Sequence, residues 1–138
     1  MAIKVVDLKQ MGGQPDAERT PLINGPHFHA WFHIYKKPGQ RDDMHCHNAD
    51  QTFYVIDGEC TMHFPDGGKS VLKPGMAALI TGGSFYQLEN SGLEPMVMMG
   101  VRSRNMETTK TILHDTREEL IRPGQVKRDA PVATSILV

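Results

Sequence analysis

Apolar and polar residues alternate over short segments along most of this chain, and Gly or Pro residues separate one segment from the next. No stretch before residue 110 has the periodicity of a useful helix. Many short strands joined by regular turns are typical of a β-sandwich or β-barrel. The pattern therefore predicts an all-β protein with strands at residues 3–7, 28–36, 42–47, 52–56, 60–64, 69–72, 76–80, 85–90, 96–101 and 108–113.

The chain of 138 residues is long enough for one domain with a proper core, and we expect a single domain over residues 1–138. Residues 1–25 and 115–138 are expected to be peripheral arms. Residues 11–25 are predicted to form an irregular loop. For the C-terminal arm two alternatives stay open, a short helix over residues 115–120 or an irregular tail.

The clearest turn lies at Asp57-Gly58, between a β-branched and aromatic segment and a second apolar segment. This dipeptide is a strong signal for a two-residue hairpin. The hairpin would place Val55 opposite Cys60, Phe53 opposite Met62, and Gln51 opposite Phe64. Cross-strand partners share a face. The predicted pocket wall is therefore Phe53, Val55, Cys60, Met62 and Phe64, with Gln51 at its polar end and His63 on the outer face.

Two histidines, His45 and His47, stand two residues apart in a predicted strand, so that both imidazoles point to the same face. Gln51 has the same parity. Two imidazoles and an amide oxygen on the inside of a sheet suit a divalent transition metal. The alternatives are a metal-free polar pocket, and a Gln51 that hydrogen-bonds His47 or a water without touching metal.

The segment around residues 28–36 alternates only loosely. His29, Trp31, His33 and Tyr35 share one face, and Phe and Ile residues occupy the other. We assign the Phe and Ile face to the core and expect His29 and His33 to lie outside. If the strand is instead buried on both faces, one of these histidines would reach the pocket.

Charge and cysteine content exclude several classes of protein. The net charge is −1 and the Lys and Arg residues are scattered, which argues against binding of nucleic acid or an anionic membrane surface. No apolar run has the length of a transmembrane helix, and the N-terminus lacks a signal-peptide layout. Cys46 and Cys60 are expected on opposite faces as free thiols, which suits the cytoplasm.

Residues 39–58 resemble the first sequence motif of the cupin family in every spacing, with Gly39, His45, His47, Gln51 and Gly58 at its positions. Residues 75–90 reproduce the spacing of the second motif, whose positions are Gly75, Thr81, Gly83, Tyr86 and Asn90. Cupins usually have Glu where this chain has Gln51, Pro where it has Thr81, and His where it has Tyr86.

The resemblance to a small single-domain cupin implies a double-stranded β-helix, that is, a jelly-roll barrel with the site inside, and a homodimer. The His-X-His…Gln pattern is similar to a subset of metal-dependent cupins. Three roles stay open for Tyr86: a phenolate ligand, a hydrogen-bond donor or general acid to the substrate, or a packing residue beside a water molecule.

We therefore expect a metal-dependent enzyme acting on a small oxygenated organic molecule, by O₂-dependent cleavage or by Lewis-acid lyase or isomerase chemistry. His45, His47 and Gln51 would hold Fe, Mn, Ni, Co or Zn, and Tyr86 would be a fourth ligand or a catalytic acid or base. The alternative is a non-catalytic cupin that binds a small ligand as a sensor or accessory protein.

Overall fold

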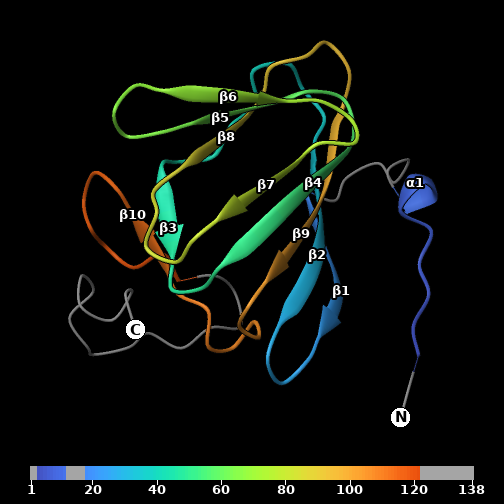
Figure 1. Cartoon of the computed structure of the whole chain (residues 1–138), viewed down its shortest axis with the longest axis horizontal. Coiled ribbons are helices and arrows are strands. Elements are labelled where there is room, and N and C mark those ends of the chain that lie inside the picture. Colours follow the sequence, from blue (N-terminus) through green and yellow to red (C-terminus); the bar gives the residue numbers. More distant parts are fainter. Residues whose placement is uncertain (1–2, 12–17, 122–138) are drawn as a thin grey trace.

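Nearly all regular structure in the computed structural model is β-strand (Figure 1), and the structure describes residues 3–11 and 18–121. The elements in chain order are α1 (Leu8–Met11), β1 (Arg19–Asn24), β2 (His29–Tyr35), β3 (His45–His47), β4 (Gln51–Asp57), β5 (Cys60–His63), β6 (Lys69–Leu72), β7 (Ala77–Ile80), β8 (Gln87–Asn90), β9 (Met96–Arg102) and β10 (Thr111–Leu113).

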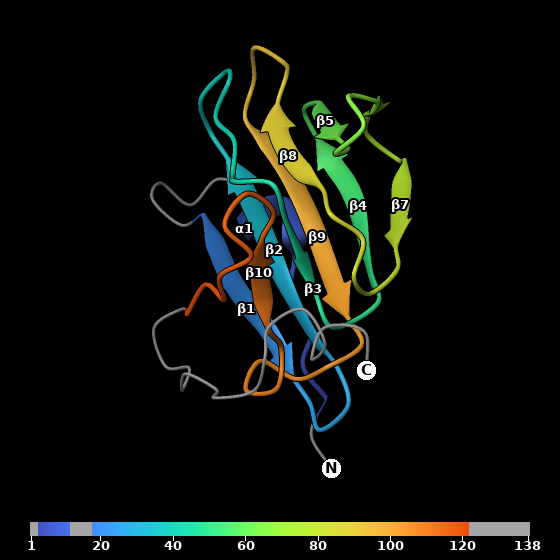
Figure 2. The same ribbon diagram turned by 90° about the vertical axis from the view of Figure 1, so that its left-hand side faces the viewer.

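The strands form two sheets that face each other (Figure 2). The larger sheet has the strand order β1-β2-β9-β4-β7. The opposite wall consists of β6-β5-β8 and β10-β3, and reciprocal backbone hydrogen bonds of 2.9 Å between His45 and Tyr86 link these two groups. All strand pairs are antiparallel. This architecture confirms the predicted all-β double-stranded β-helix.

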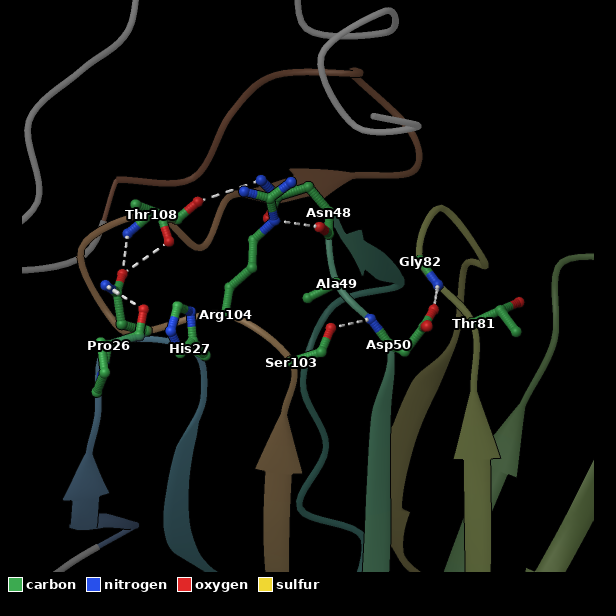
Figure 3. Close-up of a pocket in the computed structure, with 11 residues that line it drawn as sticks. Pro26, His27, Asn48, Ala49, Asp50, Thr81, Gly82, Ser103, Arg104 and Thr108 are labelled. Atoms are coloured by element: carbon green, nitrogen blue, oxygen red, sulfur yellow. Dashed lines mark hydrogen bonds between the residues drawn. The ribbon is translucent and has the colours of Figure 1, made fainter.

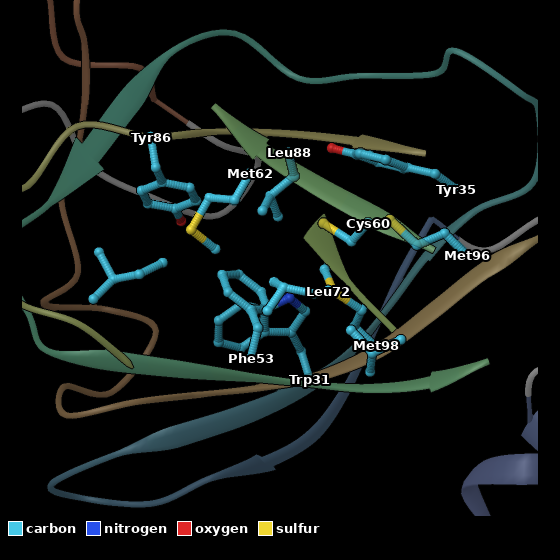
Figure 4. Packing of buried hydrophobic residues seen from close by; sticks show 12 residues of the cluster. Trp31, Tyr35, Phe53, Cys60, Met62, Leu72, Tyr86, Leu88, Met96 and Met98 are labelled. Carbon is cyan, nitrogen blue, oxygen red and sulfur yellow. The ribbon is translucent and has the colours of Figure 1, made fainter. Parts of the chain in front are cut away.

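The main core fills the space between the two sheets (Figure 4). Phe53 and Val55 point into it from β4, and Cys60 and Met62 point into it from β5, each at most 3% exposed. Phe64 is partly buried and packs against the same cluster. All five predicted pocket-wall residues therefore lie in or against this core, and each fully buried large apolar side chain contributes about 1.5–3 kcal/mol to folding.

The predicted hairpin at Asp57-Gly58 is wrong. β4 pairs with β7 and β9, whereas β5 pairs with β6 and β8, so the turn carries the chain from one sheet to the other. The paired residues expected across the hairpin are not opposite one another. Their common face was nevertheless inferred correctly, because both strands present the same parity to the core from opposite sides. The Asp57-Gly58 dipeptide indicates a chain reversal, but the burial of both strands decides which sheet each of them joins.

The outer face of the larger sheet carries a second apolar cluster, which includes Phe32 at 0% exposure. Val6 and Leu8 of the N-terminal segment pack against this cluster. β2 is consequently buried on both faces, and the other parity of the strand points into the barrel. The expectation that His29 and His33 lie outside is therefore wrong, since they are 6% and 1% exposed.

The ends of the barrel differ from the prediction in three places. Residues 3–7, predicted to be a strand, have no regular structure and lead into α1. β1, which pairs with β2, forms within the region expected to be a loop. Residues 115–120 form a turn and a bridge between Ile112 and Glu119, which corresponds to the irregular alternative instead of a helix. The expected tail at residues 122–138 lies outside the described residues. Both cysteines are free, as expected, and both are buried. None of the helices in the described ranges has the length and apolar character needed to cross a membrane.

Candidate functional site

The side chains selected from the two motifs meet in the barrel interior. His45 and His47 come from β3, Gln51 begins β4, and Tyr86 lies just before β8. All four are between 2% and 4% exposed. The His45 ring lies 4.8 Å from that of His47 and 4.5 Å from that of Tyr86, between ring centroids. The structure therefore places these four side chains close together, and the role that the sequence assigned to them stays a prediction.

Hydrogen bonds fix the orientation of the two motif histidines. Nδ1 of His45 lies 2.6 Å from the carbonyl oxygen of Asp43, and Nδ1 of His47 lies 3.1 Å from that of Lys110. Each Nδ1 therefore carries the proton, and each Nε2 is an acceptor. Burial lowers the pKa of His45 to about 4 and that of His47 well below its usual value, so both rings are neutral near pH 7.

A residue that sequence reasoning missed, Arg102, binds this cluster. Its Nε donates to Oε1 of Gln51 at 2.8 Å, and its Nη2 donates to Nε2 of His47 at 3.0 Å. Its Nη1 lies 3.4 Å from Nε2 of His29. The guanidinium also lies 4.3 Å from the centre of the Trp31 ring, a favourable cation–π distance. The residues predicted from the sequence therefore did not include Arg102, the positively charged side chain of the site.

The register of the larger sheet brings these residues together. Arg102 is the last residue of β9, and it is paired with His29 on one side and with Gln51 on the other. Gly100 makes space for Trp31, because a Cβ atom there would lie 2.4 Å from the ring. The alternation of side chains along β9 could have indicated the position of Arg102. Met96 and Met98 point inward, and in a strand extended to residue 102 the side chain of Arg102 lies on the same face.

The site carries a buried positive charge. Arg102 is 8% exposed, and burial lowers its pKa to about 10, so that it stays charged near neutrality. No Asp or Glu in the described part of the chain forms an ion pair with it. Burial raises the pKa of Tyr86 to about 12, so the phenol keeps its proton. The Tyr86 hydroxyl lies within hydrogen-bonding reach of Gln51 and Arg102.

A divalent metal ion does not fit these side chains as they are arranged. The Arg102 guanidinium already binds Nε2 of His47 and Oε1 of Gln51, two of the atoms that the sequence assigned to a metal. A dication beside it would meet strong repulsion. No cluster of three or more His, Cys, Asp or Glu side chains suited to a metal ion occurs within residues 3–11 and 18–121. Metal binding by His45, His47, Gln51 and Tyr86 stays a prediction that this arrangement does not support.

Two further polar groups lie near the cluster. His33 accepts a hydrogen bond from Nε1 of Trp31 at 3.2 Å, so its Nε2 carries a proton that has no partner in the described residues. Asp42 accepts a hydrogen bond of 2.8 Å from the Leu88 amide, and its Oδ2 lies 3.9 Å from Nδ1 of His45. Burial raises the pKa of Asp42 to about 7.

Loops at one end of the barrel connect the strands that carry the site (Figure 3). Nε of Arg104 donates to the carbonyl of Asn48 at 2.7 Å, and the Asp50 amide donates to Oγ of Ser103 at 2.9 Å. Asp50 also accepts from the Gly82 amide at 2.8 Å. These bonds join the segment after β3 to the segment after β9. They border a polar cavity of about 600 Å³ and hold the neighbours of His47, Gln51 and Arg102 in place.

The sequence matches the cupin domain family over residues 32–102, just over half of the chain. This chain is a cupin. Of its three changed motif positions, two, Gln51 and Tyr86, are partners of the buried Arg102. These two changes and the presence of the arginine therefore belong to one arrangement. Among curated proteins no sequence matches this cupin.

Solved structures share its fold at low sequence identity. An uncharacterized conserved protein with a double-stranded β-helix domain from Klebsiella pneumoniae has a TM-score of 0.66 and 22% identity, over 78% of this chain and 96% of that chain. A protein from Bacillus halodurans has a TM-score of 0.67 and 18% identity, over 84% and 86% of the two chains. A cupin-superfamily sugar phosphate isomerase from Silicibacter pomeroyi has a TM-score of 0.58 and 21% identity, over 72% and 67%.

Proposed function

We propose that this cupin binds a small oxygenated organic anion inside its barrel, with Arg102 as the counter-ion. The observation that supports this proposal is a buried guanidinium without a carboxylate partner in the described residues. A buried charge is costly unless an opposite charge accompanies it. An anionic ligand would supply that charge.

The donors around Arg102 suit a carboxylate. A guanidinium has five N–H groups, and three of them point to Gln51, His47 and His29. The remaining two belong to the terminal nitrogens, and the Tyr86 hydroxyl lies within hydrogen-bonding reach of this guanidinium. The N–H group that Tyr86 does not occupy would be left for a carboxylate, with which a guanidinium forms strong charge-assisted hydrogen bonds. The neutral Tyr86 phenol adds another donor next to them. This function corresponds to the ligand-binding alternative drawn from the sequence.

The test compares carboxylates with their uncharged amides, such as benzoate with benzamide, by isothermal titration calorimetry. Wild-type protein should bind the carboxylate and not the amide, and Arg102→Met should lose this binding by at least about ten-fold, because a hydrogen bond to a charged group contributes about 1.5–3 kcal/mol. Arg41→Met is the matched control, because Arg41 pairs with Glu89 at the surface. Equal binding of acid and amide would refute the proposal.

The metal-dependent enzyme remains a second candidate, with O₂-dependent cleavage or lyase or isomerase chemistry on a small oxygenated molecule. One observation favours it: carbonyl groups hold Nδ1 of His45 and His47, as is usual for metal-ligating histidines. Plasma mass spectrometry on wild type, His45→Ala and Arg102→Met separates the candidates. Stoichiometric metal in wild type that disappears in His45→Ala supports the enzyme. Metal bound only by Arg102→Met supports the anion site.

The cytoplasmic location and the homodimer expected from the sequence stay predictions. Sedimentation equilibrium would measure the dimer directly.

A further inference from the structure

An apolar cavity of about 700 Å³ opens between β7 and the β5-β6-β8 wall. Within the described residues β7 pairs only with β4, and β6 pairs only with β5, so the barrel wall is not closed by hydrogen bonds between them. Met62, Phe64, Leu72, Ala78 and Ile80 line the cavity, and none of its lining residues is charged. The cavity lies within the size range of small-ligand pockets.

Tyr86 joins this cavity to the arginine site. Its side chain is 2% exposed and lines the cavity, and its hydroxyl lies within hydrogen-bonding reach of Arg102. Figure 4 shows Tyr86 beside Met62, at the edge of the apolar cluster. Arg102 itself does not line the cavity, and Tyr86 is the residue that touches both. A ligand whose body lies in the cavity would therefore reach the guanidinium past the Tyr86 hydroxyl.

We infer that the ligand is a monocarboxylate with an apolar body, whose carboxylate pairs with Arg102 and whose body lies in the cavity between β6 and β7. This inference rests on the proposed function and names its ligand class. A second charge on the body would be buried in a cavity without a charged partner, at high cost. A short polar anion would leave the apolar lining unused.

The inference predicts that affinity grows with chain length. Each methylene group buried from water strengthens binding about four-fold. Isothermal titration calorimetry over linear carboxylates from acetate to octanoate should show this gain until the cavity is filled. The corresponding primary amides should bind much more weakly at every length, because they lack the charge that Arg102 requires.

A filling substitution tests the position of the body. Ala78 faces the core, opposite Phe53. Leu93 lies in the loop before β9, is 88% exposed and is not among the residues that line the cavity. Ala78→Phe should weaken octanoate at least about ten-fold, the effect of excluding two or more methylenes, and leave acetate unchanged. Leu93→Phe, the matched control outside the cavity, should change neither. Ser70→Leu, which narrows the cavity from β6, replaces Ala78→Phe if circular dichroism shows that variant to be unfolded.

The outcomes separate this inference from the proposed function. If carboxylates bind through Arg102 with no gain from chain length, the inference is overturned and the proposed function stands. Octanoate binding that Arg102→Met leaves intact overturns the inference, because the cavity would then take apolar chains regardless of charge. If no carboxylate binds wild-type protein, both are overturned.

Discussion

Replacement of Asp42 by Asn should remove a pH-dependent weakness of the fold. The Asp42 side chain is 13% exposed, and one carboxylate oxygen accepts a hydrogen bond from the Leu88 amide that an Asn side chain can keep. Burial is the main cause that raises its pKa from 3.8 to about 7, against the opposing effects of the Leu88 amide, Arg19 and Tyr35. This rise corresponds to about 4 kcal/mol.

Proton linkage determines the direction in which Asp42 changes the free energy of unfolding with pH. The folded protein holds this proton more tightly than the unfolded chain does, so the free energy of unfolding has no penalty from Asp42 below the unfolded pKa of 3.8. The penalty grows as the pH rises and is complete above the folded pKa of about 7. Asp42→Asn should therefore be close to wild type in acid and more stable by up to about 4 kcal/mol in mild alkali.

Urea unfolding at about pH 4 and about pH 8 measures the difference. Comparison of the variant with wild type at each pH cancels the titration of the other groups. Asp43→Asn is the matched control, because Asp43 is the exposed neighbour. A gain in stability that is the same at both pH values, or that Asp43→Asn shares, would refute the reasoning.

Three other outcomes are expected. Gly100→Ala should destabilise the protein by about 1–3 kcal/mol, because its Cβ would overlap the Trp31 ring, and the fluorescence of this single tryptophan should change with it; unchanged fluorescence and melting temperature would contradict this packing. Gly58→Ala should cost more than Gly75→Ala in thermal melts. Both glycines have positive φ, but only at Gly58 would a Cβ meet the backbone of Pro95, at 2.4 Å, so equal costs would show that backbone strain alone decides. The buried interior histidines have lowered pKa values, so protonation favours the unfolded chain. In the Asp42→Asn background, which removes the opposing titration of Asp42, their contribution to stability should be complete above about pH 6.5 and decline as the pH falls. Denaturant midpoints of that variant that stay flat between about pH 7 and about pH 5 would argue against neutral histidines.

Local pattern was enough to predict the fold class and the inner face. The alternation around residues 52–64 gave the correct parity for Phe53 and Met62, and the motif spacing brought His45, His47 and Tyr86 into one cluster. These inferences depend only on the period of a strand and on short-range spacing.

Other features depend on contacts between distant segments, which a single sequence does not reveal. The two strands on either side of Asp57-Gly58 join different sheets, because β4 pairs with β9 and β5 pairs with β8. The direction of His33 is decided by the N-terminal segment, which covers the opposite face of β2. The role of Arg102 requires the register between β9 and β4. One local signal would have indicated Arg102: a charged residue at the end of a strand, at a position whose side-chain alternation places it on the inner face.

The arginine cluster also has a consequence for how this chain folds. Arg102 meets Gln51, His47 and His29 across separations of 51, 55 and 73 residues. Contacts of such long range require closure of large loops, which slows folding. If the anion binds as proposed, a partly formed barrel in which β9 is still undocked cannot hold it. Ligand occupancy would thus be a marker of complete folding, and a bound carboxylate should slow unfolding because β9 can leave only after the ligand does.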